Sequence, residues 1–385
     1  MQYISYKENK KSTTNVLTEQ QRKENNEKYI KTKLEEEKYF LDKMFEKIDK
    51  NIILDNQQRE IILTEEDYVM VIAGAGSGKT TTISAKVNYL IQRKKISEKD
   101  IVVITYTNKA VNELKERINK DFNINIKIMT FHKFGYEIIK HSIHPFPKIN
   151  KNKEEIINQI IEKELLTKAK RRKKKRLLKK TMEYIKNLVH VIKNKKQEPI
   201  KKLCLTIISL IKARGYGADY LDKIKKTTKK QKRIIHFTKK VLTKYEQYQK
   251  QNNLIDFEDI INNATKIIKD KKINTRYRYI IIDEYQDISE SRYNLIMALS
   301  ENNQSKVITV GDDWQCIYGF AASNINLFTN IQKKIPYCEI MKLEKTYRNS
   351  QELINIAGNF IKKNNKQIDK QLKSNKHNQN PVKHN

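Results

Sequence analysis

Cysteine, proline and glycine are scarce in this sequence of 385 residues, which contains three, five and nine of them respectively. So few cysteines exclude a small domain held together by disulfide bonds, and so few glycines exclude a collagen-like repeat. No stretch of about 18 consecutive apolar residues occurs, so we expect no transmembrane helix. The first residues, MQYISYKENKK, are polar and lack the apolar centre of a signal peptide. These absences favour a cytoplasmic protein that does not bind membranes.

Acidic residues are few beside the basic ones, with 45 Asp and Glu against 79 Lys and Arg, and the net charge is +34. A surplus of this size predicts a polyanionic partner, because Lys and Arg that neutralise phosphates release the counterions bound there. Lys, Asn, Ile and Tyr are abundant, as AT-rich coding would produce, but that bias explains the choice of Lys over Arg better than the surplus. Nucleic acid is therefore the predicted partner, with a membrane surface or a merely solvated exterior as alternatives.

Apolar runs and helical patterns alternate over most of the chain. Apolar residues at helical spacing predict one amphipathic helix over about 19–50. Residues 150–250 are rich in Lys and helix formers and predict a helical insertion. Buried strands are predicted within 67–74, 100–107, 126–130, 277–287, 305–313 and 339–350. Strands that alternate with helices indicate an α/β fold with a mostly parallel sheet.

A glycine-rich sequence, AGAGSGKT, stands between the first predicted strand and the following helix. Its backbone N–H groups and the helix N-terminus would form a nest for phosphate groups. Lys79 would reach the β- and γ-phosphates, and the Thr80 hydroxyl would hold Mg²⁺. The alternative, a chance GKT before a helix, is disfavoured because strand, glycines and helix occur together. The predicted nucleotide-binding residues of this loop are Ala73, Gly74, Ala75, Gly76, Ser77, Gly78, Lys79 and Thr80.

Two adjacent carboxylates, Asp283 and Glu284, follow the apolar strand at 279–282. Hydrolysis of a nucleoside triphosphate needs one carboxylate to orient Mg²⁺ and another to take a proton from the attacking water. A lone Asp-Glu pair is more often a solvated pair. Its position after a buried strand, in a chain with a phosphate loop, favours Asp283 as a metal ligand and Glu284 as a catalytic base.

Read together, the motifs resemble the UvrD/Rep-type DNA helicases of superfamily 1 over about residues 40–365. The matching stretches are LDNQQREII (54–62), AGAGSGKT (73–80), ITYTNKAVNELKERI (104–118), MTFHKF (129–134), DEYQD (283–287), VGDDWQCIYGF (310–320) and LEKTYRNS (343–350). GDDWQ, DEYQDIS and KNNKQIDKQLKS look closest to the DNA helicase IV branch. The resemblance implies a RecA-like lobe that binds ATP and Mg²⁺ and couples hydrolysis to 3′→5′ movement on single-stranded DNA.

For the ATP site, the resemblance implies roles for four further residues. Gln58 would read the adenine, and Tyr347 would stack on it. Arg348 would contact the γ-phosphate, where it stabilises charge in the transition state. Gln315 would couple the γ-phosphate to the DNA track.

For DNA, the resemblance places aromatic rings between single-strand bases at Tyr106 and Phe320. Asn108, Thr130 and His132 lie in motifs that would touch the strand or its phosphates. Each has a structural alternative, since the two rings could belong to the core and the histidine could be a satisfied structural residue.

A basic run, KAKRRKKKRLLKK at 168–180, has ten Lys or Arg among thirteen residues. It predicts a helical patch that grips single-stranded or junction DNA, with a solvated face as the alternative.

The family's motor has two RecA-like lobes, and the stretch after Arg348 is too short for a second one. We therefore expect either a product truncated after the LEKTYRNS motif or a helicase whose ATP cleft is completed by self-association or by a partner chain with motifs V and VI. The alternative is a DNA-binding chain without motor activity. The predicted domains are a helical arm (1–50), a RecA-like lobe (51–145 with 251–338), a basic helical insertion (146–250) and the start of a second lobe (339–385).

Overall fold

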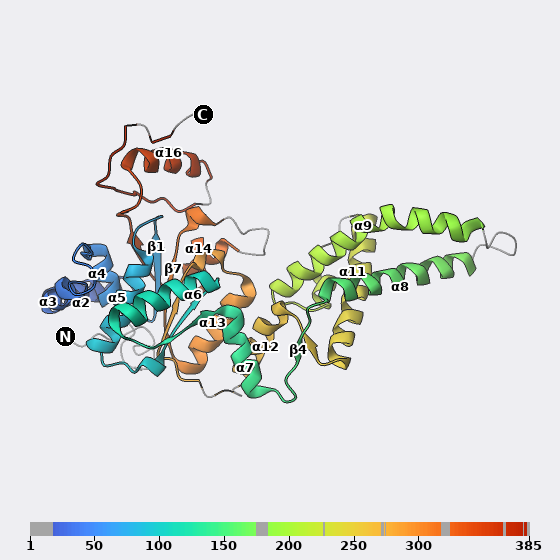
Figure 1. Ribbon diagram of the computed structural model, residues 1–385, viewed down its shortest axis with the longest axis horizontal. Coiled ribbons are helices and arrows are strands. Elements are labelled where there is room, and N and C mark those ends of the chain that lie inside the picture. Colours follow the sequence, from blue (N-terminus) through green and yellow to red (C-terminus); the bar gives the residue numbers. More distant parts are fainter. Residues whose placement is uncertain are drawn as a thin grey trace. The chain divides into compact units, whose positions relative to one another are not determined.

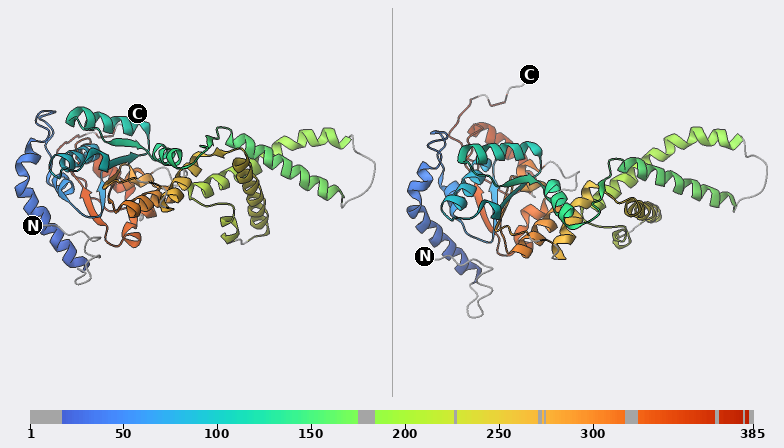
Figure 2. Two further views of the ribbon diagram at one scale, coloured as in Figure 1. Left: turned by 90° about the horizontal axis from the view of Figure 1, so that it is seen from below. Right: turned by 60° about the horizontal axis from the view of Figure 1, so that its bottom comes forward.

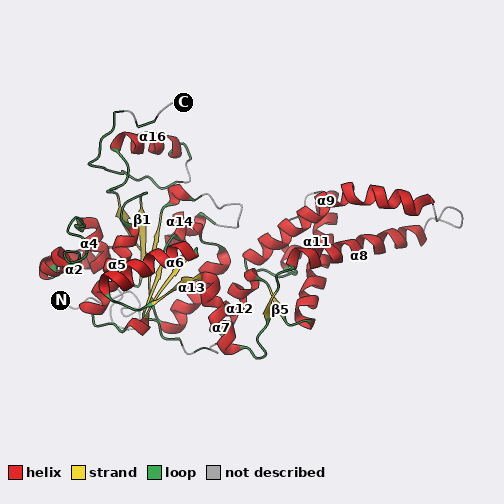
Figure 3. Ribbon diagram, viewed as in Figure 1, coloured by secondary structure: helices red, strands yellow, loops and turns green. Residues whose placement is uncertain are grey.

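The computed structural model describes residues 18–174, 184–225, 228–270, 273, 275–316, 324–364, 367–379 and 381–382, without the side chains of 168–197. The chain divides into two compact units (Figure 1). One comprises Met1–Phe134 and Ile268–Asn385, and the other comprises Gly135–Ile267. The predicted α/β class is confirmed, because the first unit contains a parallel sheet and the second is helical, as Figure 3 shows by colour.

The sheet of the first unit has six strands in the order β3-β2-β6-β7-β1-β8. Every neighbouring pair is parallel, and in the centre Val71 of β1 is opposite Val310 of β7 and Met341 of β8. The strands are β1 (Tyr68–Ala73), β2 (Ile101–Thr105), β3 (Lys127–Thr130), β6 (Tyr279–Ile282), β7 (Lys306–Gly311) and β8 (Glu339–Leu343). The segment predicted to open a second lobe therefore contributes β8 to this sheet, as the edge strand beside β1.

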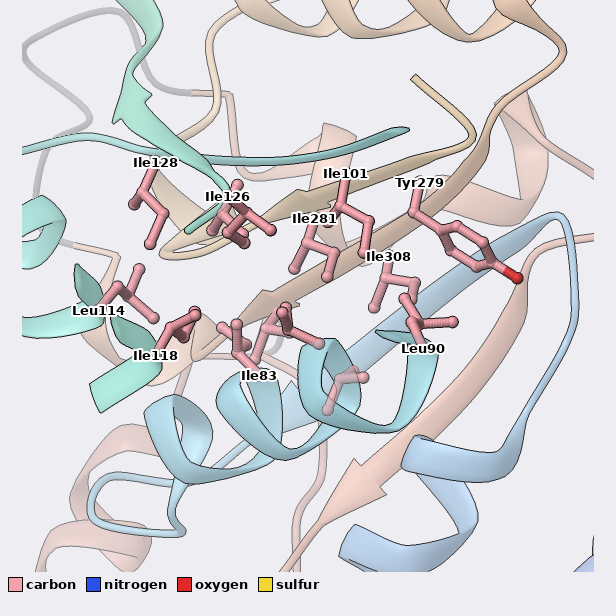
Figure 4. Close-up of a cluster of buried hydrophobic side chains, with 14 of the residues drawn as sticks. Ile83, Leu90, Ile101, Leu114, Ile118, Ile126, Ile128, Tyr279, Ile281 and Ile308 are labelled. Atoms are coloured by element: carbon pink, nitrogen blue, oxygen red, sulfur yellow. The ribbon is translucent and has the colours of Figure 1, made fainter. Parts of the chain in front are cut away.

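Two strands inside the sheet, β2 (IVVIT) and β6 (YIII), are buried along their whole length because helices cover both faces of the sheet (Figure 2). On one face lie α5 (Lys79–Gln92) and α6 (Asn108–Lys115), and Figure 4 shows Ile83, Leu90 and Leu114 packed against strand residues there. On the other face, Ile296 of α13 (Glu290–Asn303) and Ile331 of α15 (Ile331–Lys334) line a pocket together with Tyr68 and Val307 of the sheet. The remaining short helix before β8 is α14 (Asn326–Thr329).

The N-terminal segment forms two helices rather than the single helix predicted over 19–50. They are α2 (Glu19–Glu36), which begins at a Thr18 capping box, and α3 (Lys38–Lys43). Glu37 leaves the helical conformation at φ −100° and ψ 6°, and its carboxylate accepts a hydrogen bond from Arg93 at 2.7 Å. The break lets Leu41 and Phe45 pack with Tyr89 of α5. The next helix is α4 (Asn56–Leu63).

The second unit is built from three long helices, α8 (Lys153–Lys174), α9 (Tyr184–Ala213) and α11 (Lys229–Gln251), with the short α10 (Tyr220–Lys223) among the described residues between α9 and α11. Helices α7 (Phe131–Ser142) and α12 (Phe257–Lys269) connect the two units in sequence. Ile157, Ile208 and Val241 are fully buried in its core, and β4 (Lys148–Ile149) pairs with β5 (Leu254–Ile255). Residues 168–174 of the basic run end α8, and the rest of that prediction lies outside what the structure describes. No helix in the described ranges is long and apolar enough to cross a bilayer.

Candidate nucleotide-binding site

The phosphate loop connects β1 to α5 at the carboxyl edge of the sheet. Gly76 and Gly78 have left-handed backbones, with φ of +73° and +81°. Residues with a Cβ are strained in this region, which explains glycine at both positions. A Cβ added to Gly76 would also lie 2.4 Å from the Cβ of Arg348. The loop thus leads directly into the N-terminus of α5, where backbone N–H groups are free to bind an anion.

Lys79 of this loop contacts the acidic motif that follows β6. Its Nζ lies 3.1 Å from Oε2 of Glu284, and the same oxygen accepts a hydrogen bond from Nε2 of Gln286 at 2.7 Å. Glu284 itself has a left-handed backbone with φ of +53°, an uncommon conformation for a residue with a side chain. The fold thus brings together two predicted catalytic-site residues that are 205 positions apart in sequence.

Asp283 is buried beside Glu284. Burial and the neighbouring Glu284 charge raise the pKa of the Asp283 carboxyl to about 7, although Lys79 acts in the opposite direction. The Thr80 hydroxyl donates to Oε1 of Glu113 in α6 at 3.4 Å. Carboxylate and hydroxyl oxygens are the donors that Mg²⁺ prefers, and a buried carboxylate with too little opposing charge fits such a cation. Asp283 and Thr80 therefore suit the predicted metal, although no cluster of three or more His, Cys, Asp or Glu is found among the described residues.

The two predicted adenine residues meet at Asp55, the residue that caps α4. Its Oδ1 accepts the Gln58 backbone N–H at 2.8 Å, and its Oδ2 accepts the Tyr347 hydroxyl at 2.8 Å. The Gln58 side chain donates to the Ser77 carbonyl at 3.4 Å, so it touches the phosphate loop as well. Lys345 lies 5.3 Å from the centre of the Tyr347 ring.

Residues after β8 hold the phosphate loop from outside. The Thr346 hydroxyl donates to the Ala75 carbonyl at 2.8 Å, and the Tyr347 N–H donates to the Gly76 carbonyl at 2.9 Å. We call these two contacts the loop clasp. They place Arg348, predicted to bind the γ-phosphate, beside Gly76.

Gln315 follows β7, and its Nε2 donates to Oδ2 of Asp312 at 2.6 Å. Asp312 and Asp313 are both buried, and a buried lysine far along the chain, Lys370, forms ion pairs with both. Sequence analysis named Lys370 only within the stretch KNNKQIDKQLKS that resembles the helicase IV branch, and it predicted no role for this residue at the ATP site.

Four of the five predicted DNA-binding residues gather at the carboxyl ends of β2 and β3, which pair through Thr105 and Thr130. Tyr106 follows β2, Asn108 begins α6 and is exposed, and His132 lies in the first turn of α7. Phe320 lies outside the described residues.

The Tyr106 ring already has close neighbours. It packs edge-on against Phe131, with centroids 5.3 Å apart. The Arg292 guanidinium lies 4.7 Å from the Tyr106 centroid and 5.8 Å from that of Phe131. Arg292 was not predicted, and it brings a positive charge to the aromatic cluster expected to meet DNA bases.

A family model described as the UvrD/REP helicase N-terminal domain matches residues 54–336, well over half of the chain. The chain is 31% identical over 331 residues to the ATP-dependent DNA helicase Rep of Buchnera aphidicola subsp. Acyrthosiphon pisum, covering 83% of this chain and 46% of that protein. It is 28% identical to the ATP-dependent DNA helicase srs2 of Schizosaccharomyces pombe, with coverages of 84% and 36%. It is also 28% identical to the ATP-dependent DNA helicase PcrA of Staphylococcus aureus, with coverages of 83% and 41%. The chain thus spans less than half the length of these relatives.

Proposed function

The chain belongs to the UvrD/REP helicase N-terminal domain family, and from this premise we propose that it is an ATP-dependent DNA helicase. It would hydrolyse ATP and couple that reaction to 3′→5′ movement on single-stranded DNA. The observation that carries the proposal is the 3.1 Å contact between Lys79 and Glu284 at the carboxyl edge of the sheet. The names of the relatives, all ATP-dependent DNA helicases, support the same activity.

The Lys79–Glu284 contact is the resting arrangement of the site. When ATP occupies the phosphate loop, Lys79 donates to phosphate oxygens and releases Glu284. The freed Glu284 carboxylate then orients the attacking water and accepts its proton. Gln286 keeps the Glu284 side chain in place, because it donates to Oε2 at 2.7 Å.

Mg²⁺, held by Thr80 and Asp283, would neutralise charge on the phosphate oxygens. Around the nucleotide, Gln58 and Tyr347 bind the adenine, and their shared partner Asp55 keeps them adjacent. Arg348 reaches the γ-phosphate from the loop clasp. Gln315 links the phosphates to the DNA-binding side.

On the DNA side, Tyr106 and Phe320 stack with bases, and Asn108, Thr130 and His132 contact the strand. Base stacking on aromatic rings tolerates any sequence, as a translocating motor requires. We assign the ATP site to a RecA-like lobe at 51–145 with 251–338, whose sheet also contains β8, the insertion to 146–250 and the helical arm to 1–50. The proposed location is the cytoplasm.

The test is the ATPase rate of the purified chain with and without single-stranded oligothymidylate, beside Lys79→Ala. We expect turnover that DNA stimulates and that falls at least about 100-fold in the variant, because positioned charge at the phosphates contributes that much. Circular dichroism of Lys79→Ala is the control for folding. DNA binding without turnover in the wild type would contradict the motor function and leave a DNA-binding chain. Movement of the chain toward the 5′ end of a labelled strand would support the polarity.

A further inference from the structure

Lys370 lies in a segment that returns to the ATP site after α16 (Gln351–Ile361). Its side chain is fully buried, and its Nζ contacts Oδ1 of Asp312 and, at 2.7 Å, Oδ1 of Asp313. The same ammonium donates to the carbonyl of Ala73, the first residue of the phosphate loop, at 3.4 Å. The contacts with Asp312 and Ala73 are hydrogen bonds, and the contact with Asp313 is an ion pair. Three polar partners around one buried charge indicate a built arrangement rather than a side chain that is buried by chance.

Asp312 connects Lys370 to the proposed catalytic residues through two further hydrogen bonds. Its Oδ2 accepts the Gln315 side-chain amide at 2.6 Å, and its backbone N–H donates to Oε1 of Gln286 at 3.0 Å. Gln286 donates in turn to Glu284, which pairs with Lys79. An unbroken series of polar contacts therefore runs from Lys370 to the lysine of the phosphate loop.

The segment that includes Lys370 is attached to both sides of this series. The Ile368 N–H donates to Oδ2 of Asp313 at 2.7 Å, and the Ile368 carbonyl accepts the Trp314 ring N–H at 3.2 Å. On the phosphate loop, the Leu372 side chain covers Gly74 so closely that an added Cβ would lie 2.4 Å from Leu372 Cδ2. Movement of the loop or of Asp312 would therefore disturb this segment.

We propose that Lys370 is a positioning residue of the ATP site, which holds Asp312 so that Asp312 orients Gln315 and, through Gln286, Glu284. The proposal rests on the proposed function. Its physical basis is that two adjacent buried carboxylates repel each other, and the Lys370 ammonium that contacts both holds them in place. Without Lys370, the Asp312 carboxylate would move, and Gln315 would lose a fixed acceptor.

The molecule contains its own reporter of this arrangement. Trp314 is the only tryptophan of the chain, and it lies between Asp313 and Gln315. Its ring is 4.8 Å from the Lys370 ammonium. Trp314 fluorescence therefore reports the environment of the positioning residue without an added label.

The experiment compares wild type, Lys370→Met and Lys370→Arg. Binding of the non-hydrolysable analogue AMP-PNP with Mg²⁺ is measured by calorimetry, the response by Trp314 emission, and kcat and KM by ATP hydrolysis. In Lys370→Met we expect the analogue to bind within about fivefold of wild-type affinity. The nucleotide-induced emission change should fall at least fivefold and kcat at least tenfold, with KM little altered. Lys370→Arg, which keeps the cation, should recover most of both losses.

The matched control is Lys86→Met, which removes another buried lysine of the same unit. The Lys86 ammonium donates to the carbonyls of Ile62 and Thr64 at 2.7 Å each. This variant should lower the melting temperature but keep the wild-type emission response and kcat. A loss of stability alone would then be separated from a loss of positioning.

Retention of the wild-type response and kcat in Lys370→Met would overturn the proposal. If that variant does not fold, Asp312→Asn breaks the same link from the other side, and a wild-type response there would overturn it equally. A wild type that binds no nucleotide, or binds it without hydrolysis, would instead contradict the proposed function, and that result is seen before any Lys370 variant is made.

Discussion

The two ends of the six-stranded sheet both contain buried charges, but they balance them in opposite ways. At the amino ends of the strands, the buried carboxylate of Glu65 is surrounded by cations. Lys306 lies 3.0 Å away, Lys94 lies 3.3 Å away, and the Tyr279 hydroxyl also donates to it. Burial would raise the pKa of Glu65, but Lys86, Lys306 and Lys94 hold it down at about 2.

At the carboxyl ends, Asp283 and Glu284 are adjacent and share the one nearby cation of the phosphate loop, Lys79. There, burial and like charge raise the pKa of Asp283 to about 7. At the amino end, cations compensate the buried Glu65 carboxylate, and the cluster stabilises the fold. At the carboxyl end, two carboxylates share one lysine, so a bound cation would be needed to compensate their charge. This difference follows the general rule that open α/β sheets bind ligands at the carboxyl ends of their strands.

Of the substitutions that test the difference between the two ends, Glu284→Gln at the carboxyl end is expected to have the largest effect, a loss of ATP hydrolysis. A positioned general base contributes about 10²- to 10⁴-fold, so kcat should fall by at least about 100-fold. Nucleotide affinity should stay equal or increase, because Lys79 loses its competing carboxylate. ATPase assays give kcat, and calorimetry with AMP-PNP gives the affinity. A variant that keeps wild-type turnover would rule out Glu284 as the base.

At the amino end, Glu65→Gln should affect stability and leave the chemistry intact. Removal of one partner from a buried ion cluster leaves the others unpaired, which costs about 3 kcal/mol of unfolding free energy. Urea denaturation followed by circular dichroism measures this loss, and the KM for ATP should not change. The control is Glu116→Gln, which removes an exposed ion pair with Lys120 and should leave the denaturation midpoint unchanged. An altered KM in Glu65→Gln would mean that the two ends are not independent.

The same carboxylate predicts a pH dependence. Because the pKa of Glu65 is lowered to about 2 from an ordinary value of 4.5, its contribution to stability is complete above pH 4.5 and is lost as the pH falls toward 2. The stability difference between wild type and Glu65→Gln should therefore shrink as the pH is lowered from 5 toward 3. Urea denaturation of both proteins at several pH values measures it. A difference that stays constant over that range would show that Glu65 is not the charged partner.

The sequence predicted the motifs at the carboxyl ends of the strands, but it did not predict the long-range contacts that hold those motifs in place. The phosphate loop and the acidic motif are local patterns, in which glycines, a lysine and two carboxylates stand next to apolar strands. Lys370 could not be predicted in the same way, since it meets Asp312 across 58 positions and lies in a polar stretch without periodicity. For a similar reason β8 was expected to open a second lobe, because parallel pairing with a strand some 270 residues earlier leaves no signal in either sequence.

The smallest effect is expected from a substitution in the loop clasp, which should alter nucleotide affinity alone. Thr346→Val replaces a hydroxyl with a methyl group and removes the 2.8 Å hydrogen bond to the Ala75 carbonyl. One such bond contributes about 1 kcal/mol. Since the Ala75 peptide belongs to the phosphate loop, we expect AMP-PNP affinity to weaken by about fivefold.

Thr309→Val is the matched control, because it removes a hydroxyl that donates to the Val69 carbonyl within the sheet at 3.3 Å. It should cost comparable unfolding free energy and leave AMP-PNP affinity unchanged. Calorimetry and urea denaturation on both variants separate the two effects. Equal loss of affinity in both would mean that the nucleotide senses the stability of the whole sheet and not the orientation of its loop. A loss confined to Thr346→Val would show that residues after β8 help to shape the phosphate loop before the nucleotide arrives.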